Sequence, residues 1–242
     1  MTTQEFSNEF DVLYNNIMSN QAPGLNEYEK SVFLTKAQEE IIKNYFNPKG
    51  NKYQEGFDES AKRQIDFSNI TKSAKLSVIT EMDYNKIDSR STLFDFPDDV
   101  LMVINENFFM KENSKNIPLV VIPIAYDEYM KLMSKPYKYP LKYQAWRLLN
   151  MGESKKIAEL IFPRTFTEGS YNIRYIKFPS PIVLTNLEDN YSALSINGVS
   201  AESQCELDPI LHSEILQRAV ELAKAAYIGD VNTTVELGQR SE

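Results

Sequence analysis

Cys205 and His212 are the residues whose types most readily suggest nucleophilic chemistry. They are the single cysteine and the single histidine of the sequence. An imidazole beside a thiol favours the thiolate, which is the reactive form. The intervening loop would have to fold back to bring them together, and the neighbouring residues supply no convincing partner to orient the ring. Two interpretations stay open here: the site of a small cytosolic hydrolase, or an interface histidine near a buried thiol.

Metal and phosphate chemistry have weaker support in the sequence. A single histidine and a single cysteine exclude His-pair and thiolate-rich metal sites. Asp95, Asp98 and Asp99 offer carboxylates that suit a hard cation, or they form a solvated turn before a strand at Val100. The eight glycines are scattered, and Gly152–Lys156 lacks the spacing of a phosphate-binding loop. We therefore expect no catalytic, cofactor or metal site.

The segment from Lys135 to Tyr143 has the most distinctive composition. Basic residues alternate with aromatic ones, and two prolines stiffen the backbone, which lowers the entropy lost on binding. Such a mixture is typical of protein interfaces, of grooves that bind single-stranded nucleic acid, or of a plain surface loop. The formal net charge of −8 disfavours a dedicated nucleic-acid binder. The candidate inter-protein contact residues are Lys135, Tyr137, Lys138, Tyr139, Lys142 and Tyr143.

The overall composition indicates an acidic globular protein. Of the 242 residues, 42% are hydrophobic, which is enough to form a core and argues against wholesale disorder. Met1–Asp11 lacks the apolar region of a secretory signal, and no apolar run reaches about 18 residues, so we expect neither secretion nor a membrane span. Asp230–Glu242 is mostly polar and has too few apolar residues to anchor itself. We expect neighbouring chains to hold this tail; the alternative is that it folds back onto its own domain.

Helical periodicity dominates the first part of the chain. Residues 3–19 place apolar side chains three and four positions apart. A second helix begins at Asn26, whose side chain can form a reciprocal capping box with Glu29. We expect these two helices to form a hairpin, followed by a third helix from Asp58 to about Ile70.

The last predicted helix has clear ends. Asp208 is a good N-cap, Pro209 suits the first helical position, and Gly229 suits the residue after the end. Its apolar side chains predict one buried stripe, formed by Leu211, Ile215, Ala219, Leu222 and Ala226.

The middle of the chain has the pattern of a sheet. Short β-branched runs lie at 100–104 and 119–122, and a brief helix follows at Tyr126–Met133. Three further strand-like segments are separated by short turns. They are predicted to form an antiparallel meander, because short connections exclude parallel crossovers, and they span Tyr143–Leu149, Lys156–Phe162 and Tyr171–Phe178.

These elements predict an α+β protein. It has an N-terminal helical hairpin plus a third helix, a central mostly antiparallel sheet and a long C-terminal helix. We expect residues 1–75 with 205–229 to form a helical module, residues 76–204 a β-rich module, and residues 230–242 a C-terminal tail.

Two stretches resemble virion structural proteins of crAss-like tailed phages of gut Bacteroides. The first is LTKAQEEIIKNY at 34–45, continuing through FDES at 57–60 to Arg63, where a helix, a loop and an acid-capped helix follow in this order. The second is CELDP at 205–209, with HSEIL at 212–216 and Ala219-Val220. Endings similar to the second occur in head–tail connector and tail-tubular adaptor proteins of short-tailed phages. Frequent Lys, Asn, Ile and Tyr also suit an AT-rich genome.

The resemblance implies a non-enzymatic virion protein that forms a homo-oligomeric, twelvefold connector ring between portal and tail. Its partners would be copies of itself, the portal protein and other tail or ring proteins, with double-stranded DNA passing through. It would be synthesised in the bacterial host cytoplasm and located at the head–tail junction of the virion. Heterologous contacts can close such a ring, and an acidic chain can line a conduit without binding DNA tightly. A tail-hub or head-completion protein is the alternative within the virion.

Overall fold

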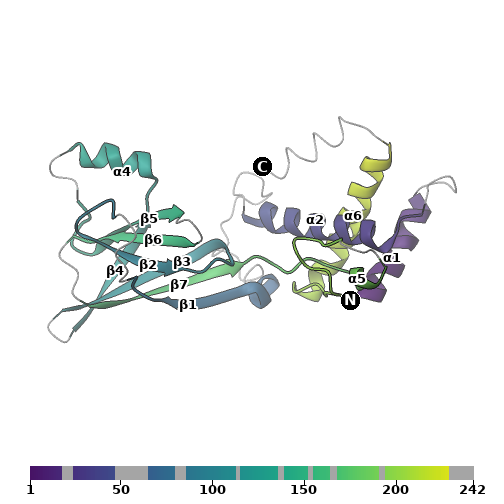
Figure 1. Cartoon of the computed structure of the whole chain (residues 1–242), viewed down its shortest axis with the longest axis horizontal. Coiled ribbons are helices and arrows are strands. Elements are labelled where there is room, and N and C mark those ends of the chain that lie inside the picture. Colours follow the sequence, from purple (N-terminus) through teal and green to yellow (C-terminus); the bar gives the residue numbers. More distant parts are fainter. Residues whose placement is uncertain are drawn as a thin grey trace. The chain divides into compact units, whose positions relative to one another are not determined.

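The computed structural model describes residues 1–17, 24–46, 65–79, 86–112, 115–135, 139–151, 155–163, 168–190 and 194–228. It confirms the α+β class (Figure 1). The chain divides into two compact units, a helical unit of Met1–Ile70 with Pro179–Glu242 and a sheet unit of Thr71–Phe178. These boundaries fall after residues 70 and 178, whereas the sequence analysis placed them after 75 and 204.

The helical unit contains α1 (Thr3–Ile17), α2 (Glu27–Phe46), α5 (Leu187–Asn190) and α6 (Pro209–Ile228). The predicted N-terminal caps of α2 and α6 are confirmed. Asn26 Oδ1 accepts from Glu29 N at 2.8 Å, and Glu29 Oε2 accepts from Asn26 N at 2.9 Å. Asp208 Oδ1 accepts from Ile210 N at 3.0 Å. These bonds satisfy N–H groups that have no partner inside the helix. None of the described helices is long and apolar enough to cross a membrane.

The predicted hairpin of the first two helices is only a minor contact. Both helices pack more extensively on α6 than on each other. From α1, the Phe6 ring lies 5.2 Å from the imidazole of His212. From α2, Glu40 accepts from Arg218 at 2.7 Å, and Arg218 also bonds Glu221 at 3.0 Å. The C-terminal helix, distant in sequence, therefore joins the two N-terminal helices.

Because α6 packs between α1 and α2, it buries more apolar side chains than the single row predicted from the sequence. Leu211, Ile215 and Ala219 are buried as predicted, but Leu222 is half-buried and Ala226 is exposed. Two adjacent rows of side chains face inward, because α6 packs against α1 and α2 together. The buried residues in these rows are Leu211, His212, Ile215, Leu216, Ala219, Val220 and Ala223.

The predicted third helix is described only from residue 65 onward. Ile65 and Asp66 are helical, and η2 (Ser68–Ile70) is a turn of 3-10 helix. Asp58 and Gly229, the predicted caps, lie outside the described residues.

Polar side chains of α2 fix an extended segment at residues 180–184. Thr35 Oγ1 accepts from Ile182 N at 3.1 Å and donates to Ile182 O at 3.3 Å. Ser31 Oγ accepts from Leu184 N at 3.0 Å, and Gln38 Nε2 donates to Ser180 O at 2.9 Å. Residues 31, 35 and 38 share one face of α2. Their side chains form hydrogen bonds with the backbone N–H and C=O groups of residues 180–184, which a neighbouring strand would otherwise provide.

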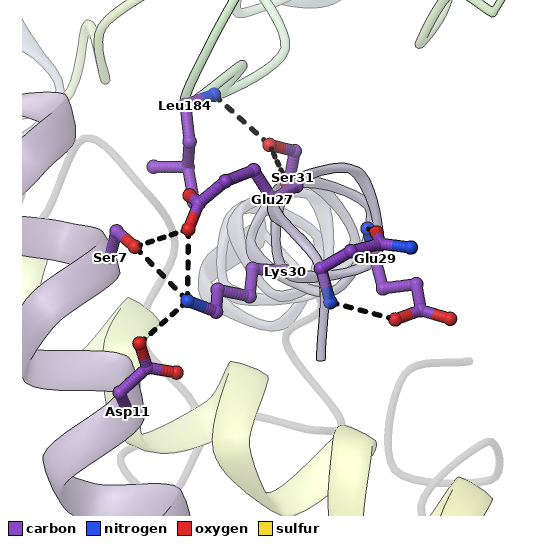
Figure 2. A network of polar contacts seen from close by, with 8 residues as sticks. Ser7, Asp11, Glu27, Glu29, Lys30, Ser31 and Leu184 are labelled. Carbon is purple, nitrogen blue, oxygen red and sulfur yellow. Dashed lines mark hydrogen bonds and ion pairs between the residues drawn. The ribbon is translucent and has the colours of Figure 1, made fainter. Parts of the chain in front are cut away.

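Figure 2 shows a second polar network, which joins α1 to α2. Lys30 Nζ lies 2.7 Å from Asp11 Oδ2, 3.0 Å from Glu27 Oε1 and 3.1 Å from Ser7 Oγ. Ser7 also donates to Glu27 at 2.8 Å. Burial opposes the charge on Lys30, but the hydrogen bonds with Asp11 and Glu27 outweigh it and raise the pKa of Lys30 above its ordinary value.

The sheet unit contains seven strands in the order β1-β7-β3-β4-β5-β6-β2. All neighbours are antiparallel except β4 and β5, which are parallel and connected through α4 (Tyr126–Met133). The predicted meander is wrong at its last step, because β7 pairs with β1 and β3 while β6 has β2 on its other edge. The strands are β1 (Thr71–Leu76), β2 (Ser91–Phe96), β3 (Val100–Glu112), β4 (Lys115–Pro123), β5 (Gln144–Met151), β6 (Lys156–Ile161) and β7 (Gly169–Lys177).

The sheet curls until its two edges meet. Just after β1, Ser77 O accepts from Asp95 N at 3.0 Å, and Ile79 N donates to Leu93 O at 2.9 Å. These bonds cover edges that would otherwise pair with other chains. Every strand contributes to the enclosed core, which includes Leu76, Phe94, Phe108, Leu119, Ala145, Leu160 and Tyr171.

A charged pair lies inside the curled sheet. Arg147 Nη2 is 2.9 Å from Glu106 Oε1, and the two side chains are 8% and 7% exposed. Tyr171 donates its phenolic hydrogen to Glu106 Oε2 at 2.5 Å. Burial raises the pKa of Glu106, although Arg147 and Tyr171 act in the opposite direction. The carboxylate is therefore held by partners from two further strands.

Buried carboxylates attach α4 to the outside of the sheet. Glu159 of β6 accepts from Ile87 N at 2.8 Å, from Asp88 N at 3.1 Å and from the Ser91 hydroxyl. Asp88 Oδ2 in turn accepts from the Tyr129 hydroxyl of α4 at 3.0 Å. The segment before β2, strand β6 and helix α4 thus share one hydrogen-bond network.

Candidate assembly surface

The predicted contact residues belong to the connection between α4 and β5. Lys135 and Lys142 are exposed, Tyr143 is 54% exposed and Tyr139 is half-buried. Tyr137 and Lys138 lie outside the described residues. The structure brings Lys142 and Tyr143 together, with the ammonium 5.3 Å from the ring centroid.

Tyr139 faces its own chain. Its ring lies 4.2 Å from the guanidinium carbon of Arg90, a cation–π contact across to the segment before β2. The base of the connection is fixed by its backbone as well, since Tyr143 O accepts from Val120 N at 2.9 Å and Leu141 O accepts from Gln144 N at 2.9 Å. This anchoring leaves Lys142 and Tyr143 on the surface.

Sequence reasoning missed three exposed apolar side chains, one in this connection and two on α4 before it. Leu141 is 67% exposed, and Tyr126 and Met130 of α4 are 57% and 53% exposed. Helical spacing gives no clear signal for the last two. Tyr129, Leu132 and Met133 pack on the sheet, and residues three or four positions apart share a helix face. Tyr126 and Met130 therefore border the packed face, and only the folded structure shows that they are exposed. Exposed apolar groups of this size mark interaction surfaces when they cluster.

Cys205 and His212 have different partners. Cys205 Sγ donates to Gln38 Oε1 at 3.3 Å. His212 Nδ1 lies 2.8 Å from the α-amino nitrogen of Met1, and Nε2 lies 3.2 Å from Leu207 O. This arrangement suits a neutral imidazole that accepts at Nδ1 and donates from Nε2.

The electrostatics of the two groups also oppose nucleophilic chemistry. Burial raises the pKa of the Cys205 thiol to about 11. Burial, together with the positive α-amino group of Met1, lowers the pKa of His212. A protonated thiol and a buried imidazole bound elsewhere do not make a nucleophile–base pair. The geometry therefore favours a structural role for both.

The three aspartates do not converge on one point. Asp99 accepts from Lys72 Nζ at 2.8 Å and from the Tyr175 hydroxyl at 3.0 Å. Burial opposes its ionisation, yet Lys72 and Tyr175 lower the pKa of Asp99 below its ordinary value. Burial and Asp99 raise the pKa of Tyr175 to about 12. In the part of the chain that the structure describes, no three acidic, histidine or cysteine side chains gather closely enough to hold a metal ion. Asp95, Asp98 and Asp99 are therefore no such group.

Comparison of the sequence with known proteins identifies its family. Residues 1–235 match the family described as phage tail ring protein 3/4. The chain belongs to the phage tail ring protein 3/4 family. This ring protein is 57% identical over 242 residues to "Ring protein 4/5" of Bacteroides phage crAss001, covering 100% of both chains. It is 34% identical over 229 residues to "Ring protein 3" of the same phage, covering 92% of this chain and 95% of the relative.

Membership confirms the resemblance to crAss-like phage proteins that the sequence analysis drew from residues 34–63 and 205–220. A ring protein of a phage is a structural component of the virion that assembles with other ring proteins. The relatives' names indicate a structural rather than a catalytic role, in agreement with the inactive surroundings of Cys205.

Proposed function

We propose that this ring protein forms a homo-oligomeric, twelvefold ring in the connector between portal and tail, through which phage DNA passes. The match to a tail ring family over residues 1–235 is the observation that carries the proposal. The protein has no catalytic task in this role. It contributes a rigid, closed sheet and a helical unit as building parts.

The surface beside α4 supports a contact with an adjoining ring. Lys135, Lys142, Tyr143 and the newly recognised Leu141 are exposed on a connection whose base is held by the backbone bonds of Leu141 and Tyr143. Aromatic and basic side chains on a fixed base lose little entropy on binding. Tyr137 and Lys138 belong to the same proposed contact.

The negative net charge of the protein suits a conduit for DNA. At a formal net charge of −8, each subunit repels phosphates, so DNA slides past without tight contacts. The polar tail Asp230–Glu242 lies outside the described residues. In this proposal it contacts a neighbouring subunit, since it has too few apolar residues to anchor on its own chain.

Electron microscopy of native virions tests the ring. The expected result is a closed ring of twelve copies stacked between portal and tail, with the lumen wide enough for duplex DNA. A location at the tail tip or as a head-completion plug, or a single copy per virion, overturns the proposal. A monomer in dilute solution does not decide it, so the measurement uses assembled particles.

Variants of the loop test the adjoining-ring contact. Replacing Tyr137, Lys138 and Tyr139 with Ala should block assembly of tails. Because Tyr139 contacts Arg90 in its own chain, a second variant, Lys142→Ala with Tyr143→Ala, leaves that contact intact. Exposed Lys75 of β1 provides a matched control as Lys75→Ala. Normal tail attachment in both loop variants contradicts the contact.

A further inference from the structure

A hollow of about 440 Å³ opens at one end of the curled sheet. Its walls are mostly apolar, and Met102 and Leu149 reach solvent there without an apolar partner to cover them, Leu149 being 53% exposed. Pockets of this volume at the open end of a closed sheet are frequent binding sites. The residues that matter for the argument are Phe96, Val100, Met102, Arg147, Leu149 and Lys156.

The described residues that line the hollow include Arg147 and Lys156 and no acid. Because Arg147 is paired with Glu106, the positive charge of the hollow comes from Lys156. Lys156 Nζ donates to Asp98 O and Val100 O, both at 3.1 Å, and lies 5.6 Å from the Phe178 ring. These partners are neutral, and no carboxylate of the described residues forms an ion pair with the ammonium. Arg147 is more than nine-tenths buried, and its Nε has no hydrogen-bond partner among the described residues. An occupant with a carboxylate beside an apolar side chain fits this lining.

Helix α4 presents such a group. Tyr126 and Met130 are one helical turn apart on its exposed flank, and Asp127 lies beside them. Asp127 pairs with Lys131 at 3.4 Å, with both side chains about three-quarters exposed, a bond that contributes little and exchanges easily. The α4 flank, defined as Tyr126, Asp127 and Met130, is therefore convex, apolar and acidic.

The hollow and the α4 flank lie on opposite faces of the same sheet. Trp146 and Leu148 of β5 pack beneath α4, which lies over β5 and β6 in Figure 1. Ala145, Arg147 and Leu149 alternate with them and so face the other way, toward the core and the hollow. One chain cannot bring its own flank to its own hollow. Complementary surfaces that point in opposite directions are what a head-to-tail ring contact requires.

We propose that the α4 flank of one copy docks in the hollow of the next copy around the ring. Met130 and Tyr126 cover Met102 and Leu149, and Asp127 exchanges Lys131 for Lys156 of the neighbour. This contact within one ring is separate from the loop that meets an adjoining ring. It rests on the proposed function, because it needs a ring built from copies of this chain.

Cysteine cross-linking in assembled particles tests the contact. In a Cys205→Ala background, Met130→Cys combined with Leu149→Cys should give, on mild oxidation, a ladder of disulfide-linked multimers. Each single-cysteine variant should give no ladder. Both positions are exposed, so the substitutions leave folding intact.

The outcomes separate this proposal from the ring itself. A ladder supports the docking. Particles with a normal ring but no ladder overturn the docking and leave the ring proposal standing, whereas particles that show no ring of this chain overturn the proposed function.

A charge exchange gives an independent readout. Asp127→Lys should reduce ring incorporation at least tenfold, and adding Lys156→Glu should restore part of it. Leu149→Asp should also reduce incorporation, while Val120→Asp, an equally exposed aliphatic position on β4, should not. Equal incorporation of Leu149→Asp and Val120→Asp overturns the docking in favour of another occupant of the hollow.

Discussion

Lys30 of α2 lies 2.7 Å from Asp11 of α1, and only 3% of Lys30 is exposed (Figure 2). This pair connects two helices that otherwise contact each other little. The two carboxylates around the ammonium remain partly in water, so the desolvation cost falls mainly on the lysine. The bond therefore orients α1 relative to α2 while α6 supplies most of the apolar packing.

We expect Lys30→Met to destabilise the helical unit by about 1–2 kcal/mol, because three charge-assisted or polar hydrogen bonds are lost while the carboxylates stay hydrated. The free energy of unfolding would be measured by urea titration with far-UV circular dichroism. Lys36→Met, at an exposed position of the same helix, should change stability far less. Equal effects of the two substitutions contradict the role assigned to Lys30.

The Lys30–Asp11 pair predicts that the free energy of unfolding depends on pH. The pKa of Lys30 is raised in the folded protein, so folding binds the proton more tightly. The stabilisation is complete below the unfolded pKa of about 10.5 and is lost as the pH rises through the folded pKa. The difference in unfolding free energy between the wild type and Lys30→Met should be constant from pH 6 to 9 and shrink above about pH 11. A difference that grows with pH would refute the assignment.

Thr35→Val should cost about 2 kcal/mol although the two side chains have nearly the same shape. The substitution removes the hydroxyl that serves both N–H and C=O of Ile182, leaving two buried backbone groups without their partner. Urea unfolding measures the loss. Ser213→Ala removes a hydroxyl from an exposed position of α6 and should be nearly neutral.

Glu159→Gln should destabilise the sheet unit by about 3 kcal/mol. Glu159 Oε1 accepts from two backbone N–H groups and the Ser91 hydroxyl, and Oε2 accepts from Asn150 Nδ2 at 3.1 Å. Whichever oxygen the amide nitrogen of glutamine replaces, it meets a donor. Fluorescence of Trp146, the single tryptophan, reports this unit during unfolding. Glu168→Gln, which loses only an exposed pair with Lys111, should cost well under 1 kcal/mol. Similar losses for the two variants would count against the buried network.

Cys205 should react slowly with alkylating reagents. With the pKa of the thiol at about 11, roughly one molecule in ten thousand carries a thiolate at pH 7. Iodoacetamide labelling followed by mass spectrometry should be at least a hundredfold slower in the folded than in the unfolded protein, and should accelerate about tenfold per pH unit between 7 and 9. Rapid labelling at pH 7 would reopen the hydrolase interpretation, as would loss of infectivity in Cys205→Ala virions that assemble normally.

The sequence by itself determined the local elements. Helical periodicity located α1, α2 and α6, with N-caps at Asn26 and Asp208 for the last two. β-branched runs located parts of β3 and β4, and strand-like segments between short turns located β5 to β7, because these signals depend on neighbouring residues. The family resemblance came from two such local stretches.

Tertiary structure decided which elements meet. β7 joins β3 instead of β6, α6 joins α1 and α2, and Thr35 satisfies the backbone of Ile182, 147 positions away. Periodicity shows which side of an element is apolar but not which distant partner covers it, since that depends on the total area buried by the whole fold. For the same reason, only the folded sheet reveals that Arg147 and Lys156 line a hollow on the face opposite α4.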